Sequence, residues 1–444
     1  MKLAPYPEYK DAGVNWIGHI PAHWDERRAK YSFKEIDERS QTGEEEMLSV
    51  SHITGVTPRS QKNVTMFKAE SNIGQKFCQP GDLVINTMWA WMAALGVSRH
   101  AGIVSPAYGV YRPKDSESYD HHYLDHLLRV EGYRTEYICR STGVRSSRLR
   151  LYPDKFLSMR VICPPIEEQK AISRFLRYQE FLFRKFILNR RHLGASLAER
   201  REAVTLEALQ LDGTQNLRLD VVAKKMERQI NRRDDEIYTP VGLYNRGRGM
   251  FHKEPTKGSE LGDSTFFWIK EGDLVLSGQF AWEGAIALAN QEDTDCVASH
   301  RYPILRGKPS VAESAYLLSF FRTGIGHLLL DHHSRGSAGR NRPLNARTLM
   351  KEKIPIPPLN VQQEIADIVY LEQKLTRTVA SQIAALHEYR TRLVADVVTG
   401  KLDVREAAAA LPEIDPLADE DALGDTLDAD AGADLDGELT EAQA

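Results

Sequence analysis

The chain has 444 residues, 42% of them hydrophobic and 27% charged, which is an ordinary globular composition and suggests two to three domains. It has no run of about 18 apolar residues and no apolar stretch over Met1–Glu8, so we expect neither a membrane span nor a secretory signal, and hence a cytoplasmic protein. The four cysteines lie far apart, which indicates neither a disulfide framework nor a structural zinc site.

The charged residues are unevenly distributed. Residues 407–444 hold 12 Asp or Glu and no Lys or Arg, so the net charge of -4 conceals a formal charge of +8 over 1–406. A basic body permits nucleic-acid binding without proving it. Because 407–444 has little apolar content and no aromatic residue, we predict an acidic, disordered tail. It is either a solvated appendage or a competitor of DNA for the basic surface.

An internal repeat organises the rest of the chain. The run Gln79–Val84 recurs as Lys270–Val275, 191 positions later, and Pro164–Gln169 recurs as Pro357–Gln362, 193 positions later. The offset drifts by only two residues between these motifs, which indicates a tandem duplication of a unit of about 190 residues.

Each copy has two parts. The first has short apolar runs after glycine turns, which predicts a compact α/β or α+β globule. The second begins at a double proline, which suits a helix start, and continues for about 45 residues without another proline. We therefore predict an α+β protein with two pseudo-repeated α/β domains separated by two long helices. The predicted segments are 1–163 (first domain), 164–212 (first helix), 213–356 (second domain), 357–406 (second helix) and 407–444 (tail).

The apolar residues of the two helices favour a pairing between them. Leu176, Phe183, Leu197, Val204 and Leu211 share one seven-residue track in the first helix. A heptad stripe of this kind is typical of a coiled-coil seam, and two copies of one unit can form a self-complementary contact. We predict an antiparallel coiled coil. The alternative is that each helix is an amphipathic element of its own domain.

Further runs of sequence carry a family resemblance. They are Tyr6–Gly18 with Ile20–Trp24, and Val84–Trp91 with Gly102–Tyr108. Together with a globule that ends in Pro-Pro-Ile-Glu-Glu-Gln, a long helix, and a second copy of both, they resemble the specificity subunit of type I restriction-modification systems. The resemblance covers residues 1–406 and leaves the tail outside.

The resemblance implies that each globule is a target recognition domain that reads one half of a bipartite, asymmetric site in double-stranded DNA. It implies that the helices hold the domains apart and dock DNA adenine methyltransferase (modification) subunits, which carry S-adenosylmethionine. A restriction subunit, an ATP-driven translocase and nuclease that uses Mg²⁺, is the further implied partner. The chain itself is expected to bind no cofactor and to perform no catalysis.

Two arginine-rich segments are the first candidates for DNA contact. Glycine and serine let the backbone approach closely, while arginine binds phosphate or the edge of guanine. A solvated loop is the alternative for either segment alone, but the feature occurs in both copies. Which arginines would read bases is left open. The candidate residues are Arg140, Arg145, Arg148 and Arg150 in the first copy and Arg335, Arg340 and Arg342 in the second.

Two further paired features could contact DNA. Asn86 and Gln279 follow the repeated Gly-Asp-Leu-Val run, and amide side chains can read adenine, whereas Trp91 and Trp282 nearby are either contacts or shared core residues. A loop earlier in each copy carries different side chains in the two copies. Copies that read different DNA sequences would show this difference, although unselected drift of a surface loop explains it nearly as well. Its candidate residues are Thr54 in the first copy and Asn245, Arg246 and Arg248 in the second.

Two patterns suggest catalysis or metal binding only superficially. Asp154, Glu168 and Lys170 fit the loose pattern of a metal-dependent nuclease, which is the alternative function, but Glu168 and Lys170 open a helix where that chemistry needs convergent strands. His122 and His126 could share a metal at i, i+4 spacing, yet they lack a convincing third ligand. No complete methyltransferase, phosphate-loop or zinc-protease motif occurs.

Overall fold

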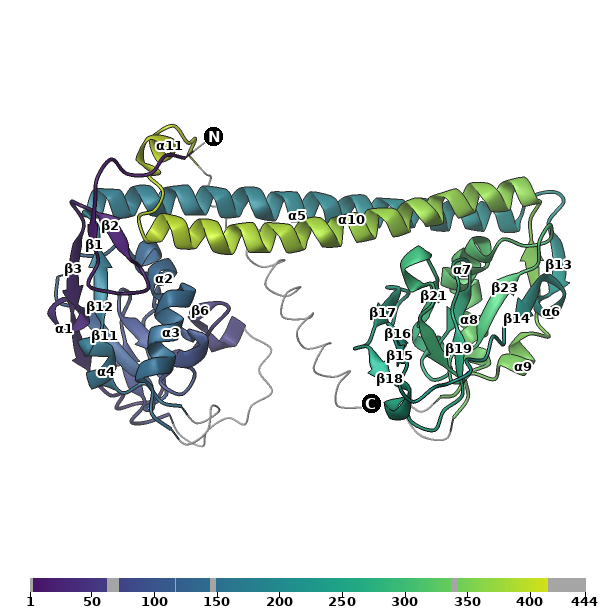
Figure 1. Ribbon diagram of the computed structural model, residues 1–444, viewed down its shortest axis with the longest axis horizontal. Helices are drawn as coiled ribbons and strands as arrows, with labels where there is room; N and C mark the ends of the chain where they lie inside the picture. Colours follow the sequence, from purple (N-terminus) through teal and green to yellow (C-terminus); the bar gives the residue numbers. More distant parts are fainter. Residues whose placement is uncertain (1–2, 62–71, 116, 144–148, 337–341, 414–444) are drawn as a thin grey trace. The chain divides into compact units, whose positions relative to one another are not determined.

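The computed structural model describes residues 3–61, 72–115, 117–143, 149–336 and 342–413, and the chain divides into two compact units (Figure 1). Unit 1 consists of residues 1–188 and 383–444, and unit 2 of residues 189–382. Both mix helices with strands and repeat one layout, so the predicted α+β class with pseudo-repeated domains is confirmed. Among the described helices, none is long and apolar enough to cross a membrane.

Unit 1 contains an antiparallel four-stranded sheet in the order β4 (Phe33–Ile36), β11 (Gly109–Pro113), β8 (Leu83–Ile85) and β9 (Leu95–Val97). Its other strands form the pairs β1 (Tyr9–Asp11) with β2 (His19–Pro21), β3 (Asp25–Arg28) with β12 (Arg160–Cys163), β5 (Leu48–Ser51) with β6 (Gly55–Pro58), and β7 (Lys76–Cys78) with β10 (Gly102–Val104). Its short helices are α1 (Ala29–Ser32), α2 (His121–Arg129), α3 (Glu131–Arg140), α4 (Pro153–Ser158) and α11 (Arg405–Ala409).

Unit 2 repeats this sheet as β14 (Ala223–Lys225), β23 (Ile304–Gly307), β20 (Leu274–Leu276) and β21 (Ile286–Leu288). Its other pairs are β13 (Gln215–Arg218) with β24 (Lys353–Ile356), β15 (Ile237–Tyr238) with β18 (Thr256–Lys257), β16 (Val241–Leu243) with β17 (Met250–His252), and β19 (Phe266–Trp268) with β22 (Val297–Ser299). Its short helices are α6 (Leu219–Val222), α7 (Ser314–Arg322), α8 (Gly324–His332) and α9 (Ala346–Leu349).

The repeated Gly-Asp-Leu-Val run is a structural turn in both units. Gly81 and Gly272 have φ of +91° and +81°, a conformation that L side chains rarely adopt. The aspartates that follow, Asp82 and Asp273, are buried at the start of β8 and β20 and accept charge-assisted hydrogen bonds from arginine. The ion pairs are Arg112 with Asp82 (2.8 Å), and Arg228 (2.6 Å) and Arg306 (2.8 Å) with Asp273.

The repeated Pro-Pro motif ends in a glutamine that anchors each long helix. Gln169 and Gln362 are fully buried, and each makes the same three hydrogen bonds to backbone groups of the preceding chain. Since a buried amide is costly unless it is bonded, this match explains why glutamine recurs in both copies. The partners are Pro164 O (2.8 Å), Ser118 O (3.1 Å) and Asp120 N (2.9 Å) for Gln169, and Pro357 O (2.8 Å), Val311 O (3.1 Å) and Glu313 N (2.9 Å) for Gln362.

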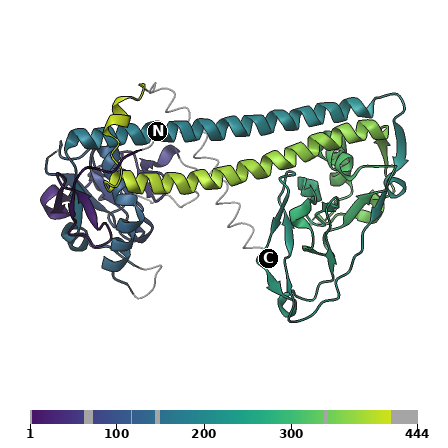
Figure 2. The ribbon, with the colours of Figure 1, turned by 45° about the horizontal axis from the view of Figure 1, so that its top comes forward.

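The long helices are α5 (Ile166–Leu209) and α10 (Leu359–Val398), and they run antiparallel within each unit (Figure 1 and Figure 2). In unit 1, Arg390 lies 2.7 Å from Glu180, and the rings of Phe183 and Tyr389 meet edge to face. In unit 2, Arg201 pairs with Glu372 at 3.0 Å. Higher numbers on α5 thus meet lower numbers on α10, which agrees with the predicted antiparallel pairing.

The second long helix is shorter than predicted, and the tail begins later. Gly400, with φ of +77°, follows the end of α10 at Val398, short of residue 406, because the chain turns back at this glycine. The next segment pairs with the N-terminal segment through the Asp403 N–H and the Ala4 carbonyl (2.8 Å). In α11, Ala407 and Ala408 are buried in the core of unit 1, so a disordered tail from 407 is wrong for these residues. Residues 414–444 lie outside the described part.

Candidate nucleic-acid interface

The arginine-rich segment of unit 1 follows α3 and is closed at its base by a β-bridge between Thr142 and Arg150. Arg140 is partly used within the protein, since its guanidinium group donates to Glu136 (2.6 Å) and to Ser158 (3.3 Å). The Arg150 side chain is exposed and forms no hydrogen bond or ion pair with any described residue. Of the two described candidates, Arg140 and Arg150, it is therefore Arg150 that is available to an external ligand. Arg145 and Arg148 lie outside the described residues.

The arginine-rich segment of unit 2 has the same construction, with a bridge between Ser334 and Leu344. Arg342 is held inside the protein: its guanidinium group lies 2.7 Å from Asp331 and stacks 4.7 Å from the ring centre of Trp282. These contacts give Arg342 a role in shaping the loop, and its contact with DNA stays a prediction. Arg335 is exposed and contacts the neighbouring His332. Arg340 lies outside the described residues.

The paired amides occupy different environments. Asn86 is buried, and its Nδ2 donates to the Tyr108 hydroxyl (3.2 Å), so it is not presented to solvent as predicted for a base reader. Gln279 is exposed. The backbone bonds Asn86 N to Ala94 O and Ser277 N to Ala285 O, both 2.9 Å, place Asn86 opposite Ser277 in the repeat. Gln279 is thus equivalent to Met88 and not to Asn86.

The two repeat-equivalent tryptophans, Trp91 and Trp282, are half-buried in both units. Their indole nitrogens donate to the carbonyls of Met88 (3.0 Å) and Gln279 (3.1 Å). This shared internal bond favours the shared-scaffold interpretation of the pair. Trp89, beside Trp91, is 49% exposed and stacks on it.

The third pair of candidate segments forms hairpin loops at the same place in each unit. In unit 1, Thr54 lies in the loop between β5 and β6, and its hydroxyl lies 2.9 Å from that of Ser51. In unit 2, Asn245, Arg246 and Arg248 lie between β16 and β17. The Asn245 amide donates to Glu283, whereas Arg246 is exposed at φ of +58°. Asn245 therefore positions the loop from which Arg246 projects.

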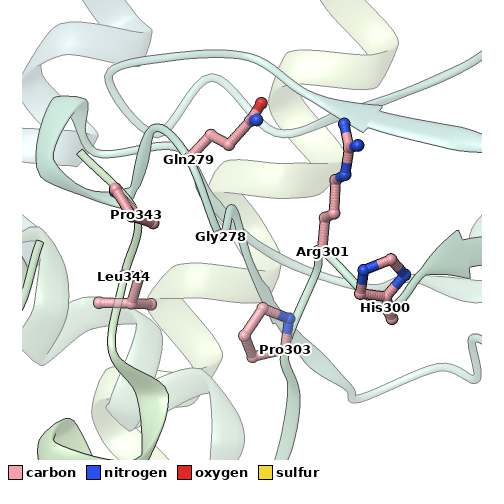
Figure 3. Close-up of a pocket in the computed structure, with 7 residues that line it drawn as sticks. All are labelled: Gly278, Gln279, His300, Arg301, Pro303, Pro343 and Leu344. Carbon is pink, nitrogen blue, oxygen red and sulfur yellow. The ribbon is translucent and has the colours of Figure 1, made fainter. Parts of the chain in front are cut away.

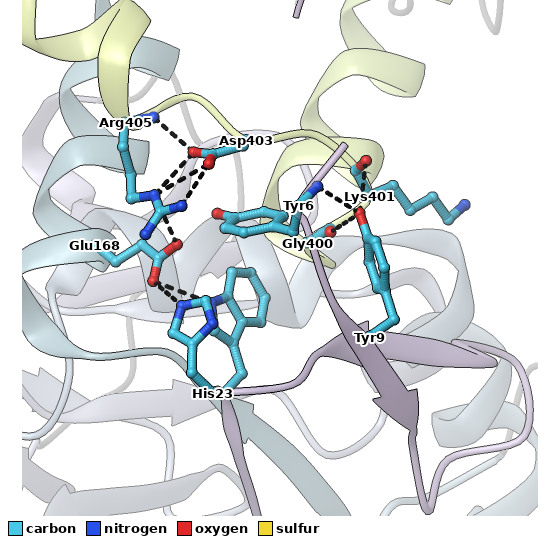
Figure 4. Close-up of polar contacts among 9 residues, drawn as sticks. Tyr6, Tyr9, His23, Glu168, Gly400, Lys401, Asp403 and Arg405 are labelled. Carbon is cyan, nitrogen blue, oxygen red and sulfur yellow. Dashed lines mark hydrogen bonds and ion pairs between the residues drawn. The ribbon is translucent and has the colours of Figure 1, made fainter. Parts of the chain in front are cut away.

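The nuclease pattern does not assemble among the described residues. Glu168 is buried, and its carboxylate lies 2.8 Å from His23 Nε2 and accepts from the indole N–H of Trp24 at 3.1 Å (Figure 4). Lys170 pairs with its neighbour Glu167, and exposed Asp154 pairs with Lys155. Each of the three side chains thus binds a different partner. The described part of the chain holds no cluster of three or more His, Cys, Asp or Glu that could bind a metal.

The contacts around Glu168 instead join the N-terminal and C-terminal segments of unit 1. Arg405 lies 3.6 Å from Glu168, pairs with Asp403 at 2.6 Å and stacks over Tyr6 (Figure 4). Burial and the neighbouring carboxylate raise the pKa of Tyr6, so its phenol stays protonated. These contacts give the Glu168 carboxylate a structural role.

The histidine pair is also structural. Burial and the nearby Arg99 and Arg177 lower the pKa of His122 to about 4, and burial lowers the pKa of His126. The guanidinium group of Arg99 lies 3.0 Å from His122 Nδ1, so this ring nitrogen already contacts a positively charged group. The pair is therefore not arranged as a metal site.

Comparisons with known proteins find similarities for the second unit and for the fold of the chain. Residues 222–383 match the family model of the type I restriction modification DNA specificity domain. A solved chain of a type I R-M system, from a study of complex assembly and conformational transition, is 18% identical with a TM-score of 0.52, covering 86% of this chain and 99% of its own. The HsdS subunit from Thermoanaerobacter tengcongensis is 17% identical with a TM-score of 0.45, and the match covers 86% of this chain and 98% of that subunit. No curated protein matches.

The family match confirms the resemblance to type I specificity subunits. Residues 222–383 are similar to a DNA specificity domain, and this similarity supports sequence-specific DNA recognition as their role. The structural match with a TM-score above 0.5 shows a shared fold.

Proposed function

We propose that the chain reads a bipartite, asymmetric DNA site, with one half-site for each unit, and docks the modification subunits of a type I restriction-modification complex. The observation that carries this proposal is the repetition of one scaffold with different exposed residues. The DNA specificity domain lies at 222–383, and unit 1 repeats its sheet order, its buried Asp–Arg pair and its buried glutamine. A unit built in the same way supports the same kind of task on a second sequence.

The charge of the chain supports this function. Residues 1–406 carry a formal charge of +8, which favours association with the phosphate backbone. Phosphate contacts position a protein on DNA without reading it, so specificity depends on the residues that reach base edges. The exposed candidates for this task differ between the units, as an asymmetric site requires.

Mapping of methylated adenines tests the bipartite site. The chain is co-expressed with its modification subunits, and the cellular DNA is sequenced by a method that reports modified bases. We expect one motif with two specified blocks separated by a gap of unspecified bases. A single uninterrupted block would contradict the assignment of one half-site to each unit.

The chain is proposed to be non-catalytic, with S-adenosylmethionine, ATP and Mg²⁺ bound by the modification and restriction subunits. Purified chain is incubated with DNA and either S-adenosylmethionine or Mg²⁺, and we expect neither methylation nor cleavage. The variant D154A is the matched control, because Asp154 belongs to the nuclease pattern and is exposed. Cleavage by the chain that D154A abolishes would establish the nuclease instead.

A further inference from the structure

Unit 2 has a hollow of about 300 Å³ where three segments far apart in the sequence meet (Figure 3). They are residues 278–279 after β20, 300–303 between β22 and β23, and 343–344 before α9. None of the residues that line the hollow is acidic, and they include Arg301 and His300. The wall is therefore compatible with a polyanion such as DNA.

Hydrogen bonds from several segments hold the backbone beneath the hollow in place. The Gly278 N–H donates to the Arg301 carbonyl (2.7 Å), and the Leu344 N–H donates to the Gly278 carbonyl (2.8 Å). A Cβ at position 278 would lie 2.2 Å from the Arg301 oxygen, so only glycine permits this approach. On either side of Arg301, the His300 N–H donates to Thr265 O (2.8 Å) and the Tyr302 N–H to Ser299 O (2.9 Å). Arg301 thus projects from a fixed backbone.

The side chains of Arg301 and Gln279 are available to an external ligand. Both are exposed and extend from neighbouring loops toward the same side of the hollow (Figure 3). Across the part of the chain that the structure describes, no residue forms a hydrogen bond or ion pair with either side-chain head group. Arg306 and Arg342 in the same unit differ in this respect, because carboxylates bind their guanidinium groups.

The chemistry of these two groups matches base edges in the major groove. A guanidinium group can donate two parallel hydrogen bonds to O6 and N7 of guanine. A carboxamide can accept from N6 and donate to N7 of adenine. A fixed backbone favours such bidentate contacts, since less conformational freedom is lost when they form.

We propose that Arg301 and Gln279 are specificity-determining residues of unit 2, with Arg301 binding the edge of a guanine and Gln279 the edge of an adenine in its half-site. This inference rests on the proposed function, in which unit 2 reads DNA. It names two base readers on one face of that unit.

Unit 1 has the same junction with different side chains. The Thr87 hydroxyl donates to the Ala107 carbonyl (2.7 Å), and the Leu151 N–H donates to the Thr87 carbonyl (2.9 Å). Thr87 and Ala107 thus stand where unit 2 has Gly278 and Arg301, and Met88 stands where it has Gln279. Met88 and Ala107 offer only apolar contact, which suits a thymine methyl group. The two half-sites should therefore differ at the bases that face this junction.

In vitro selection from a randomised DNA duplex library tests the inference. The full-length chain and the variants R301A, R301K and Q279A are each incubated with the library, and bound duplexes are sequenced. We expect R301A to lower the preference for guanine at one position by about 5- to 150-fold, with the other positions unchanged. Q279A should do the same for adenine at another position of the same half-site. R301K keeps the charge but not the bidentate fork, so it should also lose the guanine preference.

The matched control is R347A, which removes an exposed arginine on α9 outside the hollow and should leave every base preference unchanged. Variants that bind all sequences more weakly with an unaltered motif would show that Arg301 contacts phosphate, which overturns the inference. The same holds if R347A changes the motif as R301A does. A wild-type chain that enriches no sequence would overturn the proposed function and this inference together. Equal unfolding temperatures for all variants would verify that folding is intact.

Discussion

Unit 1 and unit 2 share their buried polar contacts and differ in their exposed ones. Gln169 and Gln362 make the same three backbone hydrogen bonds, and Asp82 and Asp273 both neutralise arginines on the neighbouring strand. At the surface junction, by contrast, unit 1 has Met88 and Ala107 at the positions where unit 2 has Gln279 and Arg301. The comparison teaches that recurrence between the copies marks residues that hold the fold, whereas divergence marks the candidates for base recognition.

The largest effect on stability is expected at the buried aspartate that both units share, because the two units bind it differently. Asp273 binds two arginines, whereas Asp82 binds Arg112, which also lies 3.1 Å from Glu38. D273A leaves two guanidinium groups without their carboxylate, and we expect a loss of about 3 kcal/mol from unit 2, at the lower end of the range for buried pairs because the arginines are partly exposed. D82A, the matched variant, should cost unit 1 less, because Glu38 remains.

Hydrogen exchange followed by mass spectrometry measures each unit separately. D273A should accelerate exchange in the peptides of β20 and β23, with little change in unit 1. Equal effects of D273A and D82A on their own units would show that the additional arginine contributes nothing.

A smaller effect concerns acid stability, because the two units differ at one helix. The pKa of His122 in α2 is lowered to about 4, and the equivalent position in α7 is Ala315. As the pH falls below about 6.5, the unfolded state takes up a proton that the folded state resists until about pH 4, so stability decreases across this window. We expect unit 1 to be about 1 to 2 kcal/mol less stable at pH 5 than at pH 7.5 from this histidine alone.

H122Q should remove that part of the pH dependence. Urea-dependent hydrogen exchange at both pH values, corrected for intrinsic rates, measures it, and unit 2 serves as the internal control. An unchanged pH dependence of unit 1 in H122Q would show that other groups cause the acid sensitivity.

The smallest effect separates two arginines of the paired loops. Arg150 forms no side-chain bond among the described residues, whereas Arg342 is bound by Asp331 and Trp282. R150A should weaken binding to all DNA sequences by a few-fold and reduce the slope of log K against log salt by about 0.9, while stability is unchanged. R342A should lower stability by about 1 kcal/mol through the lost cation–π contact and ion pair. Salt titration of DNA binding and thermal unfolding distinguish them, and an R150A slope equal to that of the wild type would exclude the phosphate contact.

The repeat and the long helices could be predicted from the sequence because they depend on local signals. The double proline starts a helix, and Gly-Asp-Leu-Val recurs because its turn and its buried carboxylate are needed in both copies. Leu211 shows the limit of periodicity: it lies on the predicted heptad track, yet α5 ends at Leu209 and Leu211 is 45% exposed.

The site residues were harder to predict because their state depends on tertiary contacts. Arg342 and Asn86 looked like surface readers in the sequence, but their partners Asp331 and Tyr108 come from other segments. Arg301 does not stand out among the features that occur in both copies, because its equivalent in unit 1 is Ala107. Acidic composition likewise concealed α11, whose alanines pack into unit 1 ahead of the acidic run.

The most direct measurement exchanges the recognition residues of one unit on its unchanged scaffold. In the variant M88Q/A107R, unit 1 acquires the side chains of unit 2 at this junction, while Thr87 still makes its hydrogen bond to the backbone at position 107. In vitro selection is then compared with that of the wild-type chain. We expect the half-site of unit 1 to change toward guanine and adenine at the facing positions, with the other half-site unaltered. A motif that changes in both halves, or in neither, would contradict the conclusion that the units are one scaffold carrying separate base readers.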